Sequence, residues 1–447
     1  MRSLILIGLS VGLASGCRCG SGPDSRGAGG AAGSGEATLK QPAGRVGCER
    51  TSSPYVLRSL NGKQTEATED DLGQPFAVEI GAPLVDGPRV WLPFAESGGR
   101  SARAGVLQVQ PTLTESALHE FDAAVAGGGP PRVVAVGANL VLAALVTSGK
   151  TRAYRLGMLT AGQLTWGHDV ADPGAADDST AFDLKASRDS VGLVFDTWDL
   201  KLRRGRIAGV FFSTDALQNP LSAKEFGLSG DAESPRLLPR PGGFWLTWIT
   251  HVKSQTAQAE ADAPELAGES YVTALPLGFD GSPSGEERAL TPIHGFARSY
   301  DLAAGHGGAF LLAWRDEPGV SGVEGGAVYL AQVSEQGAGQ PGLVAAPGPL
   351  AGTAPSLVFD SNPGGGAPHG WLSLESEAGG TWLGALSPEG TLLGPLHGDT
   401  VLGAGALLAA SGGRLLVAEP RAQDLQLQWM SCPAVNAASD AGLAGGR

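Results

Sequence analysis

The sequence predicts an all-β protein, a seven-bladed β-propeller with four antiparallel strands in each blade, and two observations support this. Glycine and proline account for 69 and 30 of the 447 residues, which interrupts the chain too often for long helices. Short apolar segments with a central leucine also recur along the chain, at intervals of 50, 51, 53, 66, 60 and 44 residues. A period of this size is typical of propellers and repeat arrays.

Each repeat begins with the apolar segment that is expected to form the second strand of a blade. The central leucines of these segments are Leu92, Leu142, Leu193, Leu246, Leu312, Leu372 and Leu416. Another apolar segment follows each of them after a polar turn, as a third strand would, and weaker strand-like segments lie on either side. Six or eight blades remain alternatives, because the ends of such an array are the hardest part to count.

The turns and the two ends of the repeat region fit the same architecture. Four of the third strands lead into a glycine, at Gly162, Gly281, Gly337 and Gly390, which is typical of a hairpin. The last repeat has a second and a third strand but no fourth. We expect the only unassigned strand-like segment, PYVLRSLNG at residues 54–62, to pair antiparallel with the last strand and close the ring.

Two cysteines flank the predicted closure. Cys48 precedes the closing segment and Cys432 follows the last strand, so the closure predicts a Cys48–Cys432 disulfide. In an oxidising compartment the three cysteines Cys19, Cys48 and Cys432 allow three pairings, and Cys19 is the expected odd one out. The alternative is a pair of unbonded thiols.

Tryptophan is concentrated on the predicted second and third strands. Seven of the nine lie there: Trp91, Trp245, Trp248, Trp314, Trp371, Trp382 and Trp429. One interpretation is a surface on which sugars stack. We favour packing between neighbouring blades, because these residues lie on strands and not in loops.

The N-terminus predicts a location outside the cytoplasm. The uncharged run from Ser3 to Gly16 would form a helix of roughly 21 Å, too short to cross a membrane but typical of a secretion signal. Its end, Leu13-Ala14-Ser15-Gly16-Cys17, resembles the lipobox of bacterial lipoproteins, although Ala14 stands where a larger aliphatic residue is usual. The resemblance implies cleavage before Cys17 and a lipid on its sulfur. The alternative is an ordinary signal peptide that leaves Cys17 as a free thiol.

These observations predict four regions. Residues 1–16 are the signal peptide, 17–47 a lipidated flexible tether rich in glycine, alanine and serine, 48–433 the propeller, and 434–447 a disordered tail. The formal net charge of −14, with no run of lysine or arginine, makes nucleic acid a poor partner. The expected partners are the membrane, through the lipid, and an envelope protein or a glycan.

Motifs that would indicate an enzyme are weak. The only G-x-S-x-G lies inside the signal peptide, and H-E-x-x-H and Cys-x-x-Cys are absent from the sequence, so we expect neither a metal site nor a cofactor. The segment from Glu375 to Trp382 looks like a degraded Asp-box of the sialidase-type propellers. Gly379, Thr381 and Trp382 match that motif, but Glu375 replaces its serine and Glu377 replaces its aspartate.

Acidic residues recur where second strands end, and we call these five residues the acidic rim: Glu96, Asp196, Asp316, Glu375 and Glu419. In a propeller these positions share one face, and five carboxylates there could attract a cation, a basic group or a sugar. The simpler interpretation is that acids end strands and keep loops soluble. The same face carries the longest insertions, which often form the binding face of a repeat protein.

The sequence therefore predicts a lipid-anchored, extracytoplasmic propeller that acts as a binding or scaffolding module at the cell envelope. The alternative is a glycan-directed hydrolase or lyase that uses acidic residues on one face of the propeller. A third possibility is a purely structural role in an envelope assembly. No catalytic residue can be named from the sequence.

Overall fold

The structure is a computed structural model that describes residues 49–58, 78–96, 103–110, 117–121, 129–148, 151–171, 181–252, 268–305, 309–317, 326–345, 354–360, 369–375, 381–394, 396–399, 407–420 and 424–431. All of them belong to one compact unit, Arg45–Arg447. Within these ranges the chain forms strands and no helices, so it contains no helix long and apolar enough to cross a membrane.

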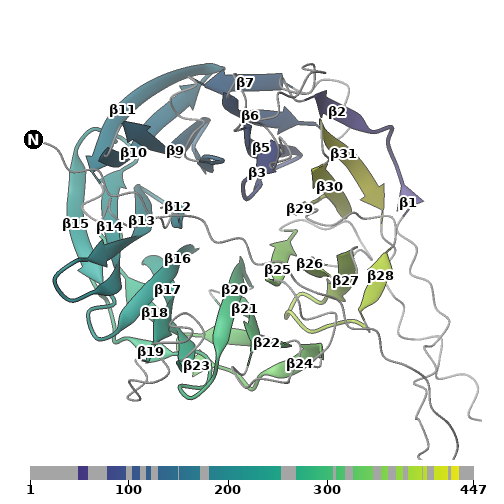
Figure 1. Ribbon diagram of the computed structural model, residues 1–447. Coiled ribbons are helices and arrows are strands. Elements are labelled where there is room, and N and C mark those ends of the chain that lie inside the picture. The colour runs from purple at the N-terminus through teal and green to yellow at the C-terminus, as the bar shows by residue number, and fades with distance from the viewer. Residues whose placement is uncertain are drawn as a thin grey trace, which may run out of the picture. The chain divides into compact units, whose positions relative to one another are not determined.

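Seven antiparallel sheets form seven blades in a ring, which confirms the predicted fold (Figure 1). Blade 1 contains β3 (Val78–Ile80), β4 (Leu84–Asp86), β5 (Arg89–Glu96), β6 (Arg103–Val109) and β7 (Ala117–Phe121). Blade 2 contains β8 (Arg132–Val136), β9 (Asn139–Ser148), β10 (Thr151–Thr160) and β11 (Gln163–Ala171). Blade 3 contains β12 (Phe182–Ser187), β13 (Ser190–Asp199), β14 (Arg204–Ser213) and β15 (Pro220–Phe226).

The second half of the ring repeats this order. Blade 4 contains β16 (Asp231–Arg240), β17 (Gly243–His251), β18 (Ser270–Leu277) and β19 (Arg288–Ala289). Blade 5 contains β20 (Ala297–Ala304), β21 (Phe310–Asp316), β22 (Ala327–Ser334), β23 (Gly337–Ala338) and β24 (Gly342–Ala345). Blade 6 contains β25 (Ser356–Phe359), β26 (Gly370–Glu375), β27 (Thr381–Leu386) and β28 (His397–Asp399).

Blade 7 is built from both ends of the chain. Its strands β29 (Leu407–Ser411), β30 (Arg414–Pro420) and β31 (Asp424–Ser431) are completed by β1 (Glu49–Arg50) and β2 (Tyr55–Arg58), which both pair antiparallel with β31. The predicted closing strand is therefore confirmed. The four cysteines, Cys17, Cys19, Cys48 and Cys432, lie outside the described residues, so the predicted lipid and disulfide stay predictions.

The turns follow the predicted chemistry. Gly162, Gly281, Gly337 and Gly390 have φ values of 84°, 75°, 127° and 80°, a region that side chains with a Cβ atom rarely enter. Each glycine follows a third strand, as expected for a hairpin.

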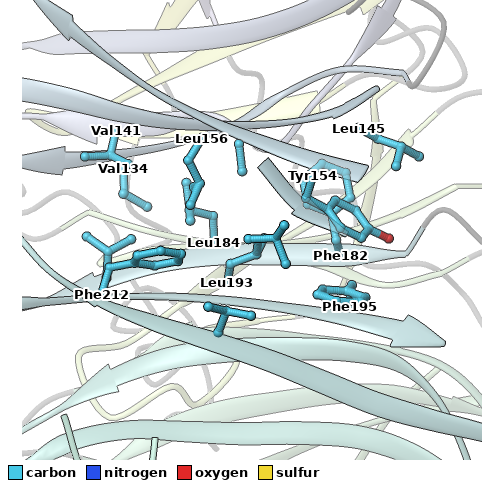
Figure 2. Close-up of a cluster of buried hydrophobic side chains, with 14 residues drawn as sticks. Val134, Val141, Leu145, Tyr154, Leu156, Phe182, Leu184, Leu193, Phe195 and Phe212 are labelled. Carbon is cyan, nitrogen blue, oxygen red and sulfur yellow. The ribbon is translucent and has the colours of Figure 1, made fainter. Parts of the chain in front are cut away.

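The core consists of seven apolar clusters, one for each boundary between neighbouring blades. Figure 2 shows the cluster between blades 2 and 3, where Tyr154 packs against Phe182 and Phe195 with ring centroids 5.1 and 4.4 Å apart. The seven tryptophans on second and third strands pack into such clusters, six of them at most 8% exposed and Trp382 partly buried. Packing between blades, not sugar stacking, therefore explains the predicted tryptophan pattern.

The first strands of the blades surround the centre of the ring. Contacts run from β4 to β8, β12, β16, β20, β25 and β29 and back to β4. A first strand has one neighbour in its own sheet, and its other side faces the adjacent blades and the central channel. Polar residues on these strands can therefore meet even though they lie far apart in the sequence.

Candidate functional site

The ring of first strands holds a cavity of about 420 Å³. Arg132 begins β8, Asp183 is the second residue of β12, and Thr381 begins the third strand β27. The cavity therefore opens toward the face where first strands begin and second strands end, and we call it the channel mouth. Its polar lining residues are Arg132, Asp183, Lys185, Arg236, Tyr300, Asp301, Ser356, Ser373 and Thr381.

Arg236 projects from β16 between two carboxylates. Burial tends to lower the pKa of Arg236, but the charges of Asp183 on β12 and Asp301 on β20 outweigh it and raise the pKa above its ordinary value. A guanidinium held in this way stays charged at any physiological pH and presents fixed donors to the channel.

The carboxylates of Asp183 and Asp301 also link neighbouring blades. Asp183 accepts a hydrogen bond of 2.9 Å from the backbone N–H of Leu237 in blade 4, and Asp301 accepts one of 2.8 Å from Leu357 in blade 6. Burial raises the pKa of Asp301 despite the nearby charge of Arg236. One oxygen of each carboxylate therefore supports the ring.

A bulge in β16 sets the position of Arg236. The pairing with β17 shifts between Glu233 and Arg236, and Ser234 within this bulge has a φ of 55°. The Tyr300 hydroxyl donates a 2.8 Å hydrogen bond to the Ser234 carbonyl and lies 3.1 Å from Thr247 Oγ1. Because burial raises the pKa of Tyr300, its hydroxyl keeps its proton and serves as a structural donor.

Two further cations line the channel mouth. Arg132 donates from Nε to the Phe182 carbonyl at 3.2 Å, and its guanidinium lies 5.4 Å from the centre of the Phe182 ring. Burial and the charge of Arg236 lower the pKa of Arg132. Lys185 Nζ lies 3.5 Å from Asp183 Oδ1, and 34% of the Lys185 side chain is exposed. Three cations thus face two carboxylates, an excess of one positive charge.

The acidic rim residues lie at the ends of second strands in five different blades. Glu96 is fully buried, and its carboxylate lies 2.8 Å from Arg103 Nε. Asp196 is 5% exposed and lies 3.4 Å from the backbone N–H of Ser234. These two side chains act inside the protein and are not exposed for contact with a partner.

Of the other rim residues, Asp316 and Glu419 are more open. Asp316 is half-buried and accepts a 2.7 Å hydrogen bond from the Phe296 N–H. Glu419 is also half-buried. Glu375 pairs with Thr381 in the backbone ladder, and its side chain lies outside the described residues. The described parts of the chain bring no three histidine, cysteine or acidic side chains close enough to hold a metal ion.

Sequence reasoning missed the channel mouth. Its charged residues belong to the weak strand-like segments that precede the leucine segments, and a charge within such a segment was the available signal. Arg132, Asp183, Arg236 and Asp301 each interrupt a run of small or apolar residues.

Comparison with known proteins supports the fold. No family model and no curated protein matches the chain. The polysaccharide lyase Uly1 has a similar structure at 9% identity and a TM-score of 0.53, covering 86% of this chain and 100% of the lyase. The β-propeller domain of the Trilobed protease from Pyrococcus furiosus shares 9% identity, with a TM-score of 0.45 and 80% and 94% covered.

An α-L-arabinanase from Penicillium chrysogenum gives similar values. It shares 12% identity and a TM-score of 0.42, with 68% of this chain and 92% of the arabinanase covered. At such low identity these similarities concern the fold alone. The chain is a seven-bladed β-propeller.

Proposed function

We propose that this propeller binds an anionic glycan at the channel mouth. The observation that carries the proposal is the gathering of Arg132, Lys185 and Arg236 in one cavity with two carboxylates. Guanidinium groups bind carboxylates through paired, charge-assisted hydrogen bonds, and every uronic acid unit carries a carboxylate. The cavity volume of about 420 Å³ is typical of small-ligand sites.

Two further observations support the glycan and the cellular location. The fold similarity to a polysaccharide lyase supports a glycan as the ligand class. The segment that ends at Cys17 resembles a lipobox and supports an extracytoplasmic, membrane-anchored protein. The proposed role is therefore a lipid-anchored binding module of the cell envelope that holds a glycan.

Cleavage of the glycan is a second candidate, and the raised pKa of Asp301 favours it. A carboxyl group whose pKa is raised by burial exchanges its proton closer to neutral pH, as a general acid or base requires. Asp183, which lies 3.5 Å from Lys185 Nζ and accepts hydrogen bonds from two backbone N–H groups, would be the second carboxyl group of the site. In this version the propeller is a glycan-directed hydrolase or lyase.

Binding is tested with the detergent-extracted full chain and a panel of polygalacturonate, alginate and hyaluronate, with dextran as the neutral polymer. We expect at least one uronate polymer to bind and dextran not to bind. Lys185→Met should weaken binding at least fivefold, and Lys224→Met, on the outer strand of the same blade, should not. Equal binding of dextran, or no effect of Lys185→Met, would contradict the proposal.

Cleavage is tested on the polymer that binds. New reducing ends, with or without the absorbance of an unsaturated product, would separate hydrolysis from elimination. Asp301→Asn should abolish either product while the polymer still binds. A wild-type protein that binds the polymer and releases no product is a binding module only.

A further inference from the structure

A second cavity of about 590 Å³ lies where blade 3 meets blade 4. It opens on the same face as the channel mouth, because its residues come from the ends of second strands, the starts of third strands and the connections beside them. We call it the blade 3–4 cavity. It is lined by Leu202, Arg204, Ser229, Gly230, Asp231, Thr250, His251, Val252 and Tyr271.

The lining combines apolar surface with a few positioned polar groups. His251 Nε2 lies 2.8 Å from Glu233 Oε1, which fixes the orientation of the imidazole. Arg204 donates from Nη2 to the Leu228 carbonyl at 2.7 Å, and its buried Nε has no hydrogen-bond partner among the described residues. The Tyr271 ring is half-buried. An aromatic ring beside hydrogen-bonding side chains suits a sugar, because a sugar presents both C–H faces and hydroxyl groups.

Strand β16 connects the two cavities. Asp231 lines the blade 3–4 cavity and Arg236 lines the channel mouth, five residues further along the same strand. This separation is at most roughly 16 Å, the span of five residues in a fully extended strand, because the bulge at Ser234 shortens it. Glu233 lies between them with 49% of its side chain exposed. A ligand long enough to reach both cavities therefore follows the exposed side of one strand.

We propose that the blade 3–4 cavity is a distal subsite for the same anionic glycan, so that the protein recognises several linked sugars and not a single one. This inference rests on the proposed function. The carboxylate of one sugar occupies the channel mouth, while a sugar further along the chain lies against Tyr271. The Nδ1 atom of His251 accepts a hydrogen bond from one of its hydroxyl groups, and Arg204 donates to its oxygens.

The test measures the affinity of the full-length protein for oligogalacturonates of two and six units. We expect wild-type protein to bind the six-unit ligand at least tenfold more tightly. His251→Asn and Tyr271→Ala should each weaken binding of the six-unit ligand at least fivefold and leave the two-unit affinity within twofold. The two variants lie on different strands, so a folding defect in one does not decide the result.

His294→Asn is the matched control. His294 Nδ1 lies 2.8 Å from Glu269 Oε2 in a similar pair, but His294 is 77% exposed and lies outside the cavity. It should bind both ligands as the wild type does. Equal losses for both lengths, or no loss at all, would overturn the subsite. A wild-type protein that binds a uronate polymer but neither oligomer would overturn the subsite alone, whereas one that binds no uronate polymer would overturn the proposed function as well.

Discussion

At the scale of single residues, burial decides what the acidic side chain at the end of β5 does. Glu96 is fully buried beside Arg103, whereas Glu120 reaches the same guanidinium at 3.1 Å with 49% of its side chain exposed. Removing Glu96 takes away the buried carboxylate that faces Arg103 and leaves the guanidinium with the exposed Glu120, whose charge water screens. Glu96 and Glu120 therefore contribute differently to the stability of the fold, although they contact the same arginine.

We predict that Glu96→Ala lowers the free energy of unfolding by about 3 kcal/mol, the usual scale for breaking a buried ion pair. Glu120→Ala should cost less than about 1 kcal/mol, since exposed pairs contribute little. Urea denaturation of the two variants beside the wild type measures both effects. Two equally small losses would mean that Glu96 is not needed for the fold.

At the scale of strands, the sequence locates a strand most reliably where both faces of that strand are buried. The second strand β17, with Leu246 and Trp248, is buried at every position except His251, because neighbouring blades cover both of its faces. The short strands β19 and β23 have only two residues each and give no such pattern. The bulge at Ser234 was equally hidden, because a serine with positive φ has no distinctive sequence signal.

The register of the strand ladder that closes blade 7 supports the predicted Cys48–Cys432 disulfide. Glu49 pairs with Ser431, and Cys48 and Cys432 are the next residues in the sequence on either side. A hydrogen bond of 2.9 Å from Thr51 N to Trp429 O fixes the alternation of the ladder. If the ladder continues by one residue, the two cysteines form a non-hydrogen-bonded pair, whose Cα separation of about 4.5 Å permits a disulfide.

We therefore predict a Cys48–Cys432 disulfide, detected by mass spectrometry of the unreduced, proteolysed protein. Its loss in Cys48→Ser or Cys432→Ser should lower stability by several kcal/mol, because it closes a loop of about 385 residues. Cys19→Ser should have no such effect. Free thiols at both positions in the oxidised protein would contradict the prediction.

At the scale of the whole molecule, the channel mouth could not be predicted because it exists only once the ring has formed. Arg132 and Asp301 are three repeats apart in the sequence, and only the circular order of blades brings both to one cavity. The repeat indicated how many blades there are and where the ring closes. It carried no information on which polar side chains of the first strands converge.

The predicted anchor belongs to this scale as well. We expect Cys17 to carry the lipid, so that the wild-type protein sediments with membranes after a high-salt wash and Cys17→Ser remains in the supernatant. The folded propeller should be unaffected, and equal melting temperatures of the two proteins would serve as the control. Membrane binding that persists in Cys17→Ser would refute the lipid attachment.

The joining of both chain ends in blade 7 also constrains when folding can finish. The hydrogen bond from Thr51 to Trp429 spans 378 residues, so the first strands to be synthesised wait for the last ones before they can pair. Contacts of such long range slow folding and leave an open sheet edge exposed in the meantime. The middle blades can assemble early, whereas the ring gains its final boundary only when β31 pairs with β1 and β2.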